Sequence, residues 1–332
     1  MAHGHVTSID VARRANVSQS AVSRTFTPGA SVSPETRARV LAAAHELGYR
    51  PNVLARAVIS GRSHLIALLV AYLDNHFYPQ ILERMSRTLQ ARGYQVLLVM
   101  TDTGDQDEIV QKMLQYQVDG IVMASASLSS TLAQECASTG TPVVLFNRTV
   151  PTLQTSSVTS DNVQGGRFLA EFLTSAGHRR IAFIAGHEDS STSQDREQGF
   201  RAGLREKLFA RAVGGYTTQG AVAAARTLMD RPTRPDAIFV ANDHMAFPVM
   251  DLLRRDYRMR IPDDISIVGY DDVPEAAWDG YSLTTVAQPA EQMVQATVAI
   301  LLDQIESQTI NRRAEILPAQ LIVRNSARKP NE

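Results

Sequence analysis

The sequence predicts a small all-α head followed by a larger α/β body built from two parallel-sheet lobes. Three observations support this fold class. The first 62 residues contain short amphipathic helical patterns, the remainder alternates short apolar runs with helical stretches, and that alternation occurs twice. A chain of 332 residues usually forms more than one domain, and an apolar content of 44% is ample for globular cores.

The first two helices of the head are expected to form a helix-turn-helix. Ile9, Ala12 and Ala15 recur at helical spacing, and residues 16–18 break the pattern. Ser18 is a suitable N-cap for the second helix, because its side-chain oxygen can accept a hydrogen bond from a backbone N–H of the first turn. Two short helices joined by a tight turn form a helix-turn-helix, whose second helix enters the major groove of DNA with its N-terminus first.

The early residues of the second helix are therefore candidates for base contacts. Gln19 can pair with adenine, the methyl group of Ala21 can meet a thymine methyl, and Arg24 can pair with guanine. Ser20 lies in the same turn. These positions predict which side chains read the DNA sequence.

Capping residues at both ends of a segment predict a third helix. Ser33 is the expected cap, Pro34 occupies the first helical position, and Gly48 ends the helix. The buried face of this helix is expected to contain Val40, Ala44 and Leu47.

The distribution of charge supports DNA binding independently of the motif. The first 62 residues contain eight arginines and three acidic residues, a net charge of +5, whereas the whole chain carries −1 and the remainder therefore −6. A basic segment joined to an acidic one is typical of a protein that binds phosphates through one end only. The alternative, an arginine-rich solvated helical surface, does not account for the turn pattern.

The head resembles that of the LacI/GalR (lactose and galactose repressor) family of transcription regulators. Residues 10–24 carry the pattern DVA…AxVSxxxVSR, residues 32–52 carry VSPETRxRVLxAAxELGYxPN, and residues 55–56 carry the hinge pair AR. The order and spacing of these pieces are specific, and the resemblance continues to the end of the chain. It implies a DNA-binding domain at residues 1–50, a hinge at 51–62, and an effector-binding and dimerisation domain at 63–332.

The resemblance and the helix positions together imply one set of DNA-contacting residues. Those residues are Thr7, Ser18, Gln19, Ser20, Ala21, Ser23, Arg24, Thr27, Ser33, Tyr49, Asn52, Ala55, Arg56 and Val58.

The sequence of the body alternates strand and helix patterns in two βαβ series. This alternation predicts parallel sheets that are covered by helices on both faces. In the first series, strands are expected at residues 65–71, 94–100, 120–125 and 142–147, with helices around 78–92, 107–117 and 129–139. In the second, strands are expected at 180–185, 237–241 and 265–270, with helices near 162–176, 194–208, 220–230 and 243–256.

The resemblance implies a periplasmic-binding-protein-like fold in which the chain crosses between two lobes near residues 160, 288 and 318. Lobe one would then contain residues 63–160 and 289–318, and lobe two residues 161–288 and 319–332.

Polar residues that follow the strands are the candidates for a ligand site, because ligands of open parallel sheets bind at the carboxyl ends of the strands. The amide, carboxylate and guanidinium groups suit the hydroxyls of a sugar, and Phe77 or Tyr216 can stack on a sugar ring. The alternative is that residues such as Asn242, Asp243 and Asp271 only cap helices. The family places effector contacts at Asn147, Thr192, Arg196, Tyr216, Asn242, Asp271 and Gln288, and the strand ends add Asn75, Phe77, Tyr78 and Asp161.

Other classes of protein are less compatible with the sequence. No G-x-S-x-G, H-E-x-x-H, P-loop or C-x-x-C pattern occurs, so we expect no enzyme, cofactor or metal site. The single cysteine, Cys136, cannot form an internal disulfide and is expected to be buried in a cytosolic protein. No segment is apolar enough for a membrane span or an export signal, which disfavours a periplasmic receptor.

The resemblance implies a homodimer that binds palindromic double-stranded operator DNA, with a sugar or sugar derivative in the cleft as effector. The chain ends without the leucine heptads of tetrameric relatives. Ligand closing the cleft would move the hinges and change operator affinity through one two-state equilibrium. A repressor of carbohydrate utilisation is expected; a nucleobase or sugar-phosphate ligand, or a co-repressor, are the alternatives.

The hinge departs from the family pattern at Val58, where relatives commonly carry a leucine that wedges between central base pairs. Valine is one methylene shorter and branched at Cβ. We predict that Val58→Leu tightens operator binding by about 0.8 kcal/mol, the value of one buried methylene, and increases the DNA bend. Unchanged affinity and bend angle would mean that Val58 does not enter the groove.

Overall fold

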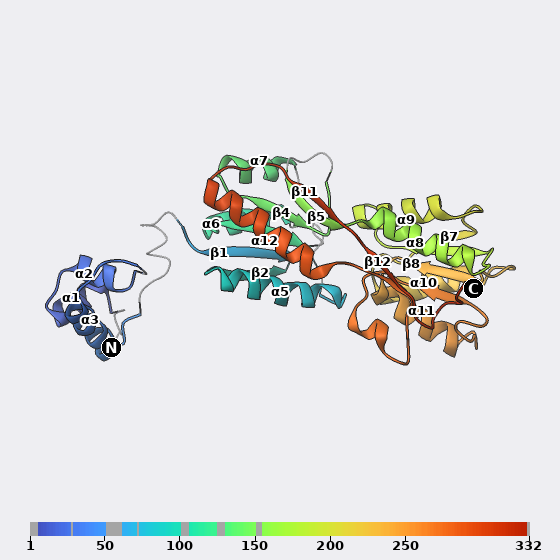
Figure 1. Ribbon diagram of the computed structural model, residues 1–332, viewed down its shortest axis with the longest axis horizontal. Helices are drawn as coiled ribbons and strands as arrows, with labels where there is room; N and C mark the ends of the chain where they lie inside the picture. The colour runs from blue at the N-terminus through green and yellow to red at the C-terminus, as the bar shows by residue number, and fades with distance from the viewer. Residues whose placement is uncertain are drawn as a thin grey trace. The chain divides into compact units, whose positions relative to one another are not determined.

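The computed structural model describes residues 6–27, 29–50, 62–71, 73–100, 106–124, 130–150 and 155–330. The chain divides into two compact units, a head of residues Met1–Ser63 and a body of residues His64–Glu332 (Figure 1). The head is helical and the body is α/β, as predicted. None of the helices in the described ranges is long and apolar enough to cross a membrane.

The head contains three helices, α1 (Ser8–Ala15), α2 (Gln19–Thr25) and α3 (Pro34–Leu47). The predicted caps are confirmed: the Ser18 hydroxyl accepts from Ala21 N, that of Ser33 accepts from Thr36 N, and Gly48 ends α3 with φ of 66°. Positive φ favours glycine there, because a Cβ would be strained.

The buried face of α1 differs from the prediction. Ile9 is 53% exposed, whereas Val11 is fully buried and packs with Val22 and Val40 in the core of the head. The apolar spacing 9–12–15 and the spacing 11–12–15 both fit a helix, and only the packing of α2 and α3 selects between them.

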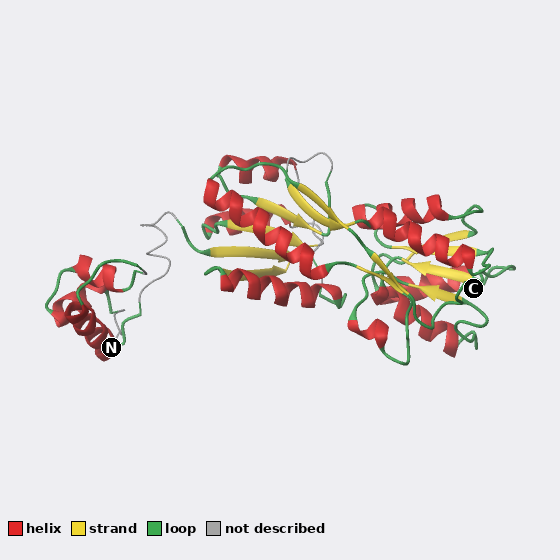
Figure 2. Ribbon diagram, in the orientation of Figure 1, coloured by secondary structure: helices red, strands yellow, loops and turns green. Residues whose placement is uncertain are grey.

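The body contains two sheets of parallel strands with helices on both faces (Figure 2). We define lobe one by the six-stranded sheet, of order β11-β5-β4-β3-β1-β2, and lobe two by the four-stranded sheet, of order β7-β6-β8-β9. A third, two-stranded antiparallel sheet pairs β10 (Thr285–Ala287) with β12 (Gln320–Ile322).

Lobe one agrees closely with the predicted first series. Its strands are β1 (Leu65–Val70), β2 (Gln95–Met100), β3 (Gly120–Ala124), β4 (Val143–Phe146), β5 (Ser156–Ser160) and β11 (Ala314–Leu317). Its helices are α5 (Phe77–Ala91), α6 (Gln106–Gln115), α7 (Ser130–Ser138) and α12 (Ala290–Ser307). Cys136 is buried here, and burial raises the pKa of its thiol to about 11.

Lobe two adds elements that the hydrophobic pattern did not delimit. Its strands are β6 (Ile181–Ala185), β7 (Ala210–Val213), β8 (Ala237–Val240) and β9 (Ser266–Val268). Its helices are α8 (Asn162–Ser175), α9 (Ser191–Gly203), α10 (Thr218–Met229), α11 (Asp243–Arg255) and the short 3₁₀ helix η1 (Pro274–Ala277). The prediction placed α9 at 194–208; it begins three residues earlier because Ser190 caps it by accepting from Ser193 N.

The ends of several strands from both lobes therefore meet between the lobes. β5 leads from lobe one into α8, β10 leads back toward α12, and β11 is followed by β12, which runs beside β10 (Figure 1). The residues that follow β1, β4, β6, β8 and β9 lie on the edges of the two sheets where the chain passes between them.

Candidate DNA interface and ligand site

Helix α2 presents polar side chains on the surface of the head. Gln19, Ser20, Ser23 and Arg24 are all exposed. Gln19 Nε2 donates to Ser8 Oγ at 3.1 Å, and Arg24 Nε donates to the carbonyl of Ser20 at a marginal 3.4 Å. These weak, exposed contacts leave the side chains accessible, as a base-reading helix requires.

Ala21 does not support the predicted thymine contact. The residue is only 8% exposed, although it is not part of the apolar cluster that forms the core of the head. In a helix that packs on a core with one face, every third or fourth residue lies on that face. Ala21 lies at such a position of α2. The thymine contact of this residue therefore stays a prediction, with little exposed surface to support it.

The remaining predicted DNA residues of the head hold its own structure together. Thr7 forms a capping box with Asp10, its hydroxyl donating to Asp10 Oδ2 at 2.7 Å. The Thr27 hydroxyl donates to the carbonyl of Ser23 at 2.9 Å, and the Tyr49 ring lies 5.8 Å from that of Phe26. Of the hinge candidates, Asn52, Ala55, Arg56 and Val58 lie outside the described residues.

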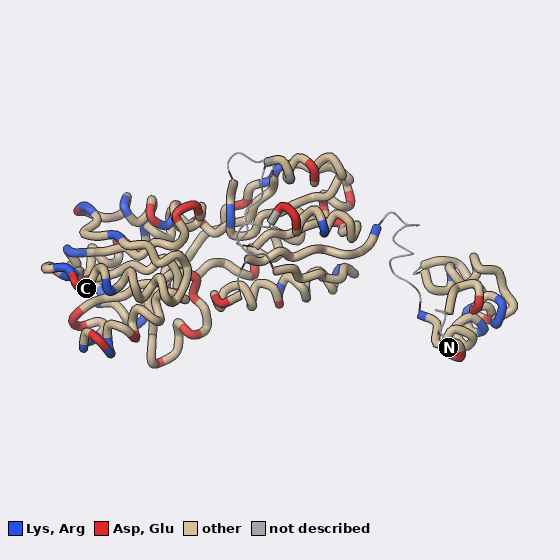
Figure 3. Tube along the Cα trace, turned by 180° about the vertical axis from the view of Figure 1, so that it is seen from behind, with Lys and Arg blue, Asp and Glu red and all other residues tan. Residues whose placement is uncertain are grey.

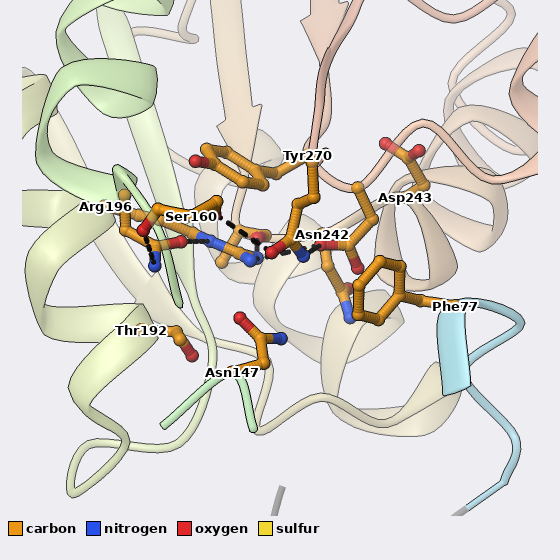
Figure 4. A network of polar contacts seen from close by, with 12 residues as sticks. Phe77, Asn147, Ser160, Thr192, Arg196, Asn242, Asp243 and Tyr270 are labelled. Atoms are coloured by element: carbon orange, nitrogen blue, oxygen red, sulfur yellow. Dashed lines mark hydrogen bonds and ion pairs between the residues drawn. The ribbon is translucent and has the colours of Figure 1, made fainter. Parts of the chain in front are cut away.

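In the body, the predicted ligand residues converge on one buried polar network (Figure 4). Its centre is Arg196 of α9, whose side chain is 2% exposed. Arg196 Nε donates to Asn162 Oδ1 at 2.9 Å, Nη1 to the carbonyl of Ala241 at 2.6 Å, and Nη2 to Asp271 Oδ1 at 3.1 Å. The guanidinium also lies 3.7 Å from the ring centroid of Tyr270.

Asp271 links this centre to two of the three segments in which the chain passes between the lobes. Gln288 Nε2 donates to Asp271 Oδ1 at 2.7 Å, Ser160 Oγ donates to Gln288 Oε1 at 2.9 Å, and Asn75 Nδ2 lies 3.4 Å from Asp271 Oδ2. Burial raises the pKa of Asp271, and Arg196 opposes that rise. The ion pair is buried, so each charge depends on the other and on these hydrogen bonds.

A second group of contacts lies beside the first and joins the lobes. Asn147, which follows β4, has its Nδ2 3.4 Å from the hydroxyl of Tyr78. Arg148 of lobe one donates to the hydroxyl of Thr192 of lobe two, and that hydroxyl lies 3.4 Å from the hydroxyl of Tyr216.

Two buried atoms of this region have no hydrogen-bond partner among the described residues, namely Asn147 Oδ1 and Asn242 Nδ2. One is an acceptor and the other a donor. Buried polar groups are nearly always hydrogen-bonded, so each of these two atoms has hydrogen-bonding capacity left for a bound molecule. A cavity of about 310 Å³ reaches Asp271 and Gln288 from the side of Phe77 and α12.

The capping alternative holds for part of the predicted set. Asp161 Oδ1 accepts from Gln164 N at 2.8 Å and caps α8, and Asn242 Oδ1 accepts from Met245 N at 3.0 Å and caps α11. Among the described residues, the Asp161 side chain makes this capping contact and no other hydrogen bond, whereas the Nδ2 of Asn242 has no partner there. Phe77 is 5% exposed and packs on Phe146 and Tyr78, so it is a wall of the region rather than a free stacking surface.

Arg148 and Asn162 of the network belong to the polar residues that follow strands, which the sequence predicts as ligand candidates. One further network residue could not be predicted in this way. Ser160 is the last residue of β5, and nothing in its sequence context distinguishes it from a sheet serine.

Comparison with known proteins finds a family match for the head and another for the body. The description "Bacterial regulatory proteins, lacI family" matches residues 9–52, and "Periplasmic binding protein-like domain" matches residues 170–327. The HTH-type transcriptional regulator CelR of Thermobifida fusca is 36% identical over 329 residues, covering 95% of this chain and 96% of the relative. The ribose operon repressor of Escherichia coli K12 is 30% identical and covers 96% and 98%.

The chain belongs to the LacI family of transcription regulators. A lac repressor dimer bound to operator and the anti-inducer ONPF matches with a TM-score of 0.87 at 28% identity, covering 97% of this chain and 99% of that one. A CelR–cellobiose complex matches with a TM-score of 0.72 at 34% identity, covering 97% and 100%.

Membership of the LacI family makes this protein a DNA-binding transcription regulator rather than an enzyme. The helix-turn-helix of its head and the two α/β lobes of its body are the two parts that the family combines.

Proposed function

We propose that this protein is a repressor of carbohydrate-utilisation genes that binds a palindromic operator as a dimer and responds to a sugar-like effector between its lobes. We also propose that the two lobes move relative to each other as bodies. Lobe one contains residues 63–160 and 289–318, and lobe two contains residues 161–288 and 319–332. The observation that carries the proposal is the buried polar network between the lobes, with an unpaired acceptor on Asn147 and an unpaired donor on Asn242.

A sugar hydroxyl fits both atoms, because a hydroxyl donates one hydrogen bond and accepts others. Asn147, Thr192, Arg196, Tyr216, Asn242, Asp271 and Gln288 are the proposed effector contacts, with Asn75 and Tyr78 behind them. The similarity to a cellobiose complex supports a sugar ligand.

A thermal-shift screen of sugars, nucleobases and sugar phosphates tests the ligand, followed by fluorescence anisotropy on operator DNA with each stabilising compound. We expect a neutral sugar to raise Tm and to change operator affinity, since a ligand that favours one lobe arrangement must couple to DNA. Stabilisation by nucleobases or sugar phosphates alone would instead support the alternative ligand classes. Turnover of a sugar by the purified protein would contradict the proposal.

Arg24 is expected to read one base pair. Its side chain is exposed on α2 and makes only a long contact with the carbonyl of Ser20. Arg24→Ala should weaken binding to the true operator by about 1–3 kcal/mol and relax the preference at one position. The measurement is anisotropy on an operator library with each base pair changed in turn. Equal weakening on all DNA sequences would show that Arg24 contacts only phosphate.

The homodimer is proposed to use the free edge of the lobe-one sheet. Leu98 and Met100 of the edge strand β2 are each 47% exposed, and an exposed apolar edge strand is a surface on which another chain can pair or pack. We predict that Leu98→Glu raises the dimer Kd about 30-fold, the equivalent of about 2 kcal/mol for a central interface residue.

Light scattering at several concentrations measures that change. Tyr116→Glu is the matched control, because Tyr116 is also in lobe one and is 59% exposed but is not part of β2. A tetramer at all concentrations, or equal dissociation of both variants, would contradict the proposed interface.

A further inference from the structure

The turn that carries Asp271 has an unusual backbone. Asp271 and the next residue, Asp272, have φ angles of 117° and 55°, and neither is glycine. Among the residues that the structure describes, no other two consecutive non-glycine residues both have positive φ. A residue with a Cβ is strained in this region. The contacts around the turn must therefore hold it in this conformation.

The Asp271 side chain explains why glycine does not occupy this position. The side chain is 3% exposed, and its Oδ1 accepts from Arg196 Nη2 and from Gln288 Nε2. The backbone N–H of Asp271 donates to the carbonyl of Val286 at 2.8 Å. Glycine would relax the backbone but would remove the buried carboxylate. Because φ sets the direction of Cβ, the strained conformation also sets where that carboxylate lies.

The end of the turn is held by Asp243 of α11 (Figure 4). Asp243 is fully buried. Its Oδ2 accepts from the backbone N–H of Val273 at 3.1 Å, and its Oδ1 accepts from the hydroxyl of Thr285 at 2.7 Å. One carboxylate therefore joins the turn to β10.

The middle of the turn is held by Arg324, which follows β12. Arg324 Nη2 lies 2.7 Å from Asp272 Oδ1, and the two groups form an ion pair without the alignment of a hydrogen bond. Arg324 Nη1 donates to the carbonyl of Leu283 at 2.8 Å, and its backbone N–H donates to the hydroxyl of Thr284 at 2.9 Å. Arg324 thus joins the turn to the segments of β10 and β12.

The ion pair of Arg324 and Asp272 differs from the surface pairs of the body. Figure 3 shows charged residues of both signs along many helices and loops of the body, and an exposed pair contributes little to stability. The side chains of Arg324 and Asp272 are only 20% and 24% exposed, and the guanidinium has a second partner in the backbone. Such a pair can hold a strained residue in place.

We propose that Asp272 and Arg324 are positioning residues of the effector site. Arg324 holds Asp272 at positive φ, and this keeps the preceding carboxylate directed at Arg196 and Gln288. Neither Asp272 nor Arg324 needs to touch the effector. Since Arg324 belongs to a segment in which the chain passes between the lobes, a shift of that segment would reach Asp271 through the ion pair. The proposal rests on the proposed function only for its effect on the effector, because the position of Asp271 can be measured without a ligand.

Nuclear magnetic resonance of the full chain labelled with ¹⁵N-arginine measures that position. The Nε–H of Arg196 donates to Asn162 Oδ1, and the same guanidinium is paired with Asp271, so its signal reports on the pair. Arg324→Ala should shift this signal and speed its exchange with solvent about tenfold or more, because the pair opens more often.

Arg226→Ala is the matched control, because it also removes an ion pair of lobe two, and neither Arg226 nor its partner Asp256 belongs to the network. It should leave the Arg196 signal unchanged. The Nε–H of Arg211, which donates to Glu197, is the internal reference and should stay unchanged in both variants.

Replacement of Asp272 by glycine or by alanine separates positioning from the loss of a charge. Both variants lose the ion pair, but only glycine adopts a φ of 55° without strain. We expect Asp272→Gly to keep the Arg196 signal close to its original position and to have a higher Tm than Asp272→Ala. At a position of negative φ the order of Tm is the reverse. Arg324→Ala added to Asp272→Gly should have little further effect on the signal.

An unchanged Arg196 signal in Arg324→Ala would overturn the proposal, and so would equal shifts in Asp272→Gly and Asp272→Ala. A shift of the same size in Arg226→Ala would attribute the effect to general destabilisation and would also overturn it. If the signals change as expected but no sugar of the screen binds, the positioning role stands and only the proposed effector class fails.

Discussion

Truncation of Arg196 to alanine is expected to abolish the effector response and to destabilise lobe two by about 3–5 kcal/mol, because it leaves the buried carboxylate of Asp271 unpaired. The side chain forms hydrogen bonds with Asn162, the carbonyl of Ala241 and Asp271, all from different elements. Because the side chain is 2% exposed, we expect Arg196 to contribute to folding stability as well as to the response.

Denaturant unfolding and effector titration measure the two effects separately. Arg167→Ala is the control, since its ion pair with Glu171 is about half exposed on both sides and should contribute less than about 1 kcal/mol. A double variant, Arg196→Met with Asp271→Leu, removes both buried charges. It should recover much of the stability without recovering the effector response. Recovery of both would mean that the ion pair does not bind effector.

Gly199→Ala is expected to lower the stability and the effector affinity by comparably large amounts, although it replaces no polar side chain. A Cβ at Gly199 would lie 1.8 Å from the carbonyl oxygen of Val163, and one at Gly166 would lie 2.2 Å from the carbonyl oxygen of Arg196. α8 and α9 therefore pack backbone against backbone. Alanine favours a helix by about 1 kcal/mol over glycine, but the clash is with rigid backbone and should cost about 3 kcal/mol.

Separation of the two helices would also move Arg196 away from Asn162, the first residue of α8, which follows the cap residue Asp161. We expect effector affinity to fall at least about tenfold in Gly199→Ala, measured by calorimetry, together with a lower Tm. Gly280→Ala is the matched control, because its added Cβ meets nothing within 4 Å. Unchanged affinity in Gly199→Ala would show that the helix contact does not position Arg196.

Much of this protein is determined by local sequence. The caps Ser18, Ser33 and Gly48 form where predicted because a cap depends on one side chain or one φ angle next to it in the chain. Four of the six lobe-one strands, β1 to β4, end within one or two residues of the predicted bounds, since a buried parallel strand is a short apolar run in the sequence itself. The head patterns and the βαβ order were sufficient to indicate the family.

The tertiary structure decided which of several equivalent residues face inward and which polar groups meet. Ile9 and Val11 both fit the periodicity of α1, and Ala21 suited a DNA contact by position, yet burial of Val11 and Ala21 depends on how α2 and α3 pack. Asp161 and Asp271 both follow strands. Only Asp271 meets a cation, because α9 brings Arg196 to it across 75 residues of sequence, whereas Asp161 is used by the helix that begins beside it. Local rules predict elements and caps, but the pairing of buried charges depends on contacts between distant segments, which no local pattern encodes.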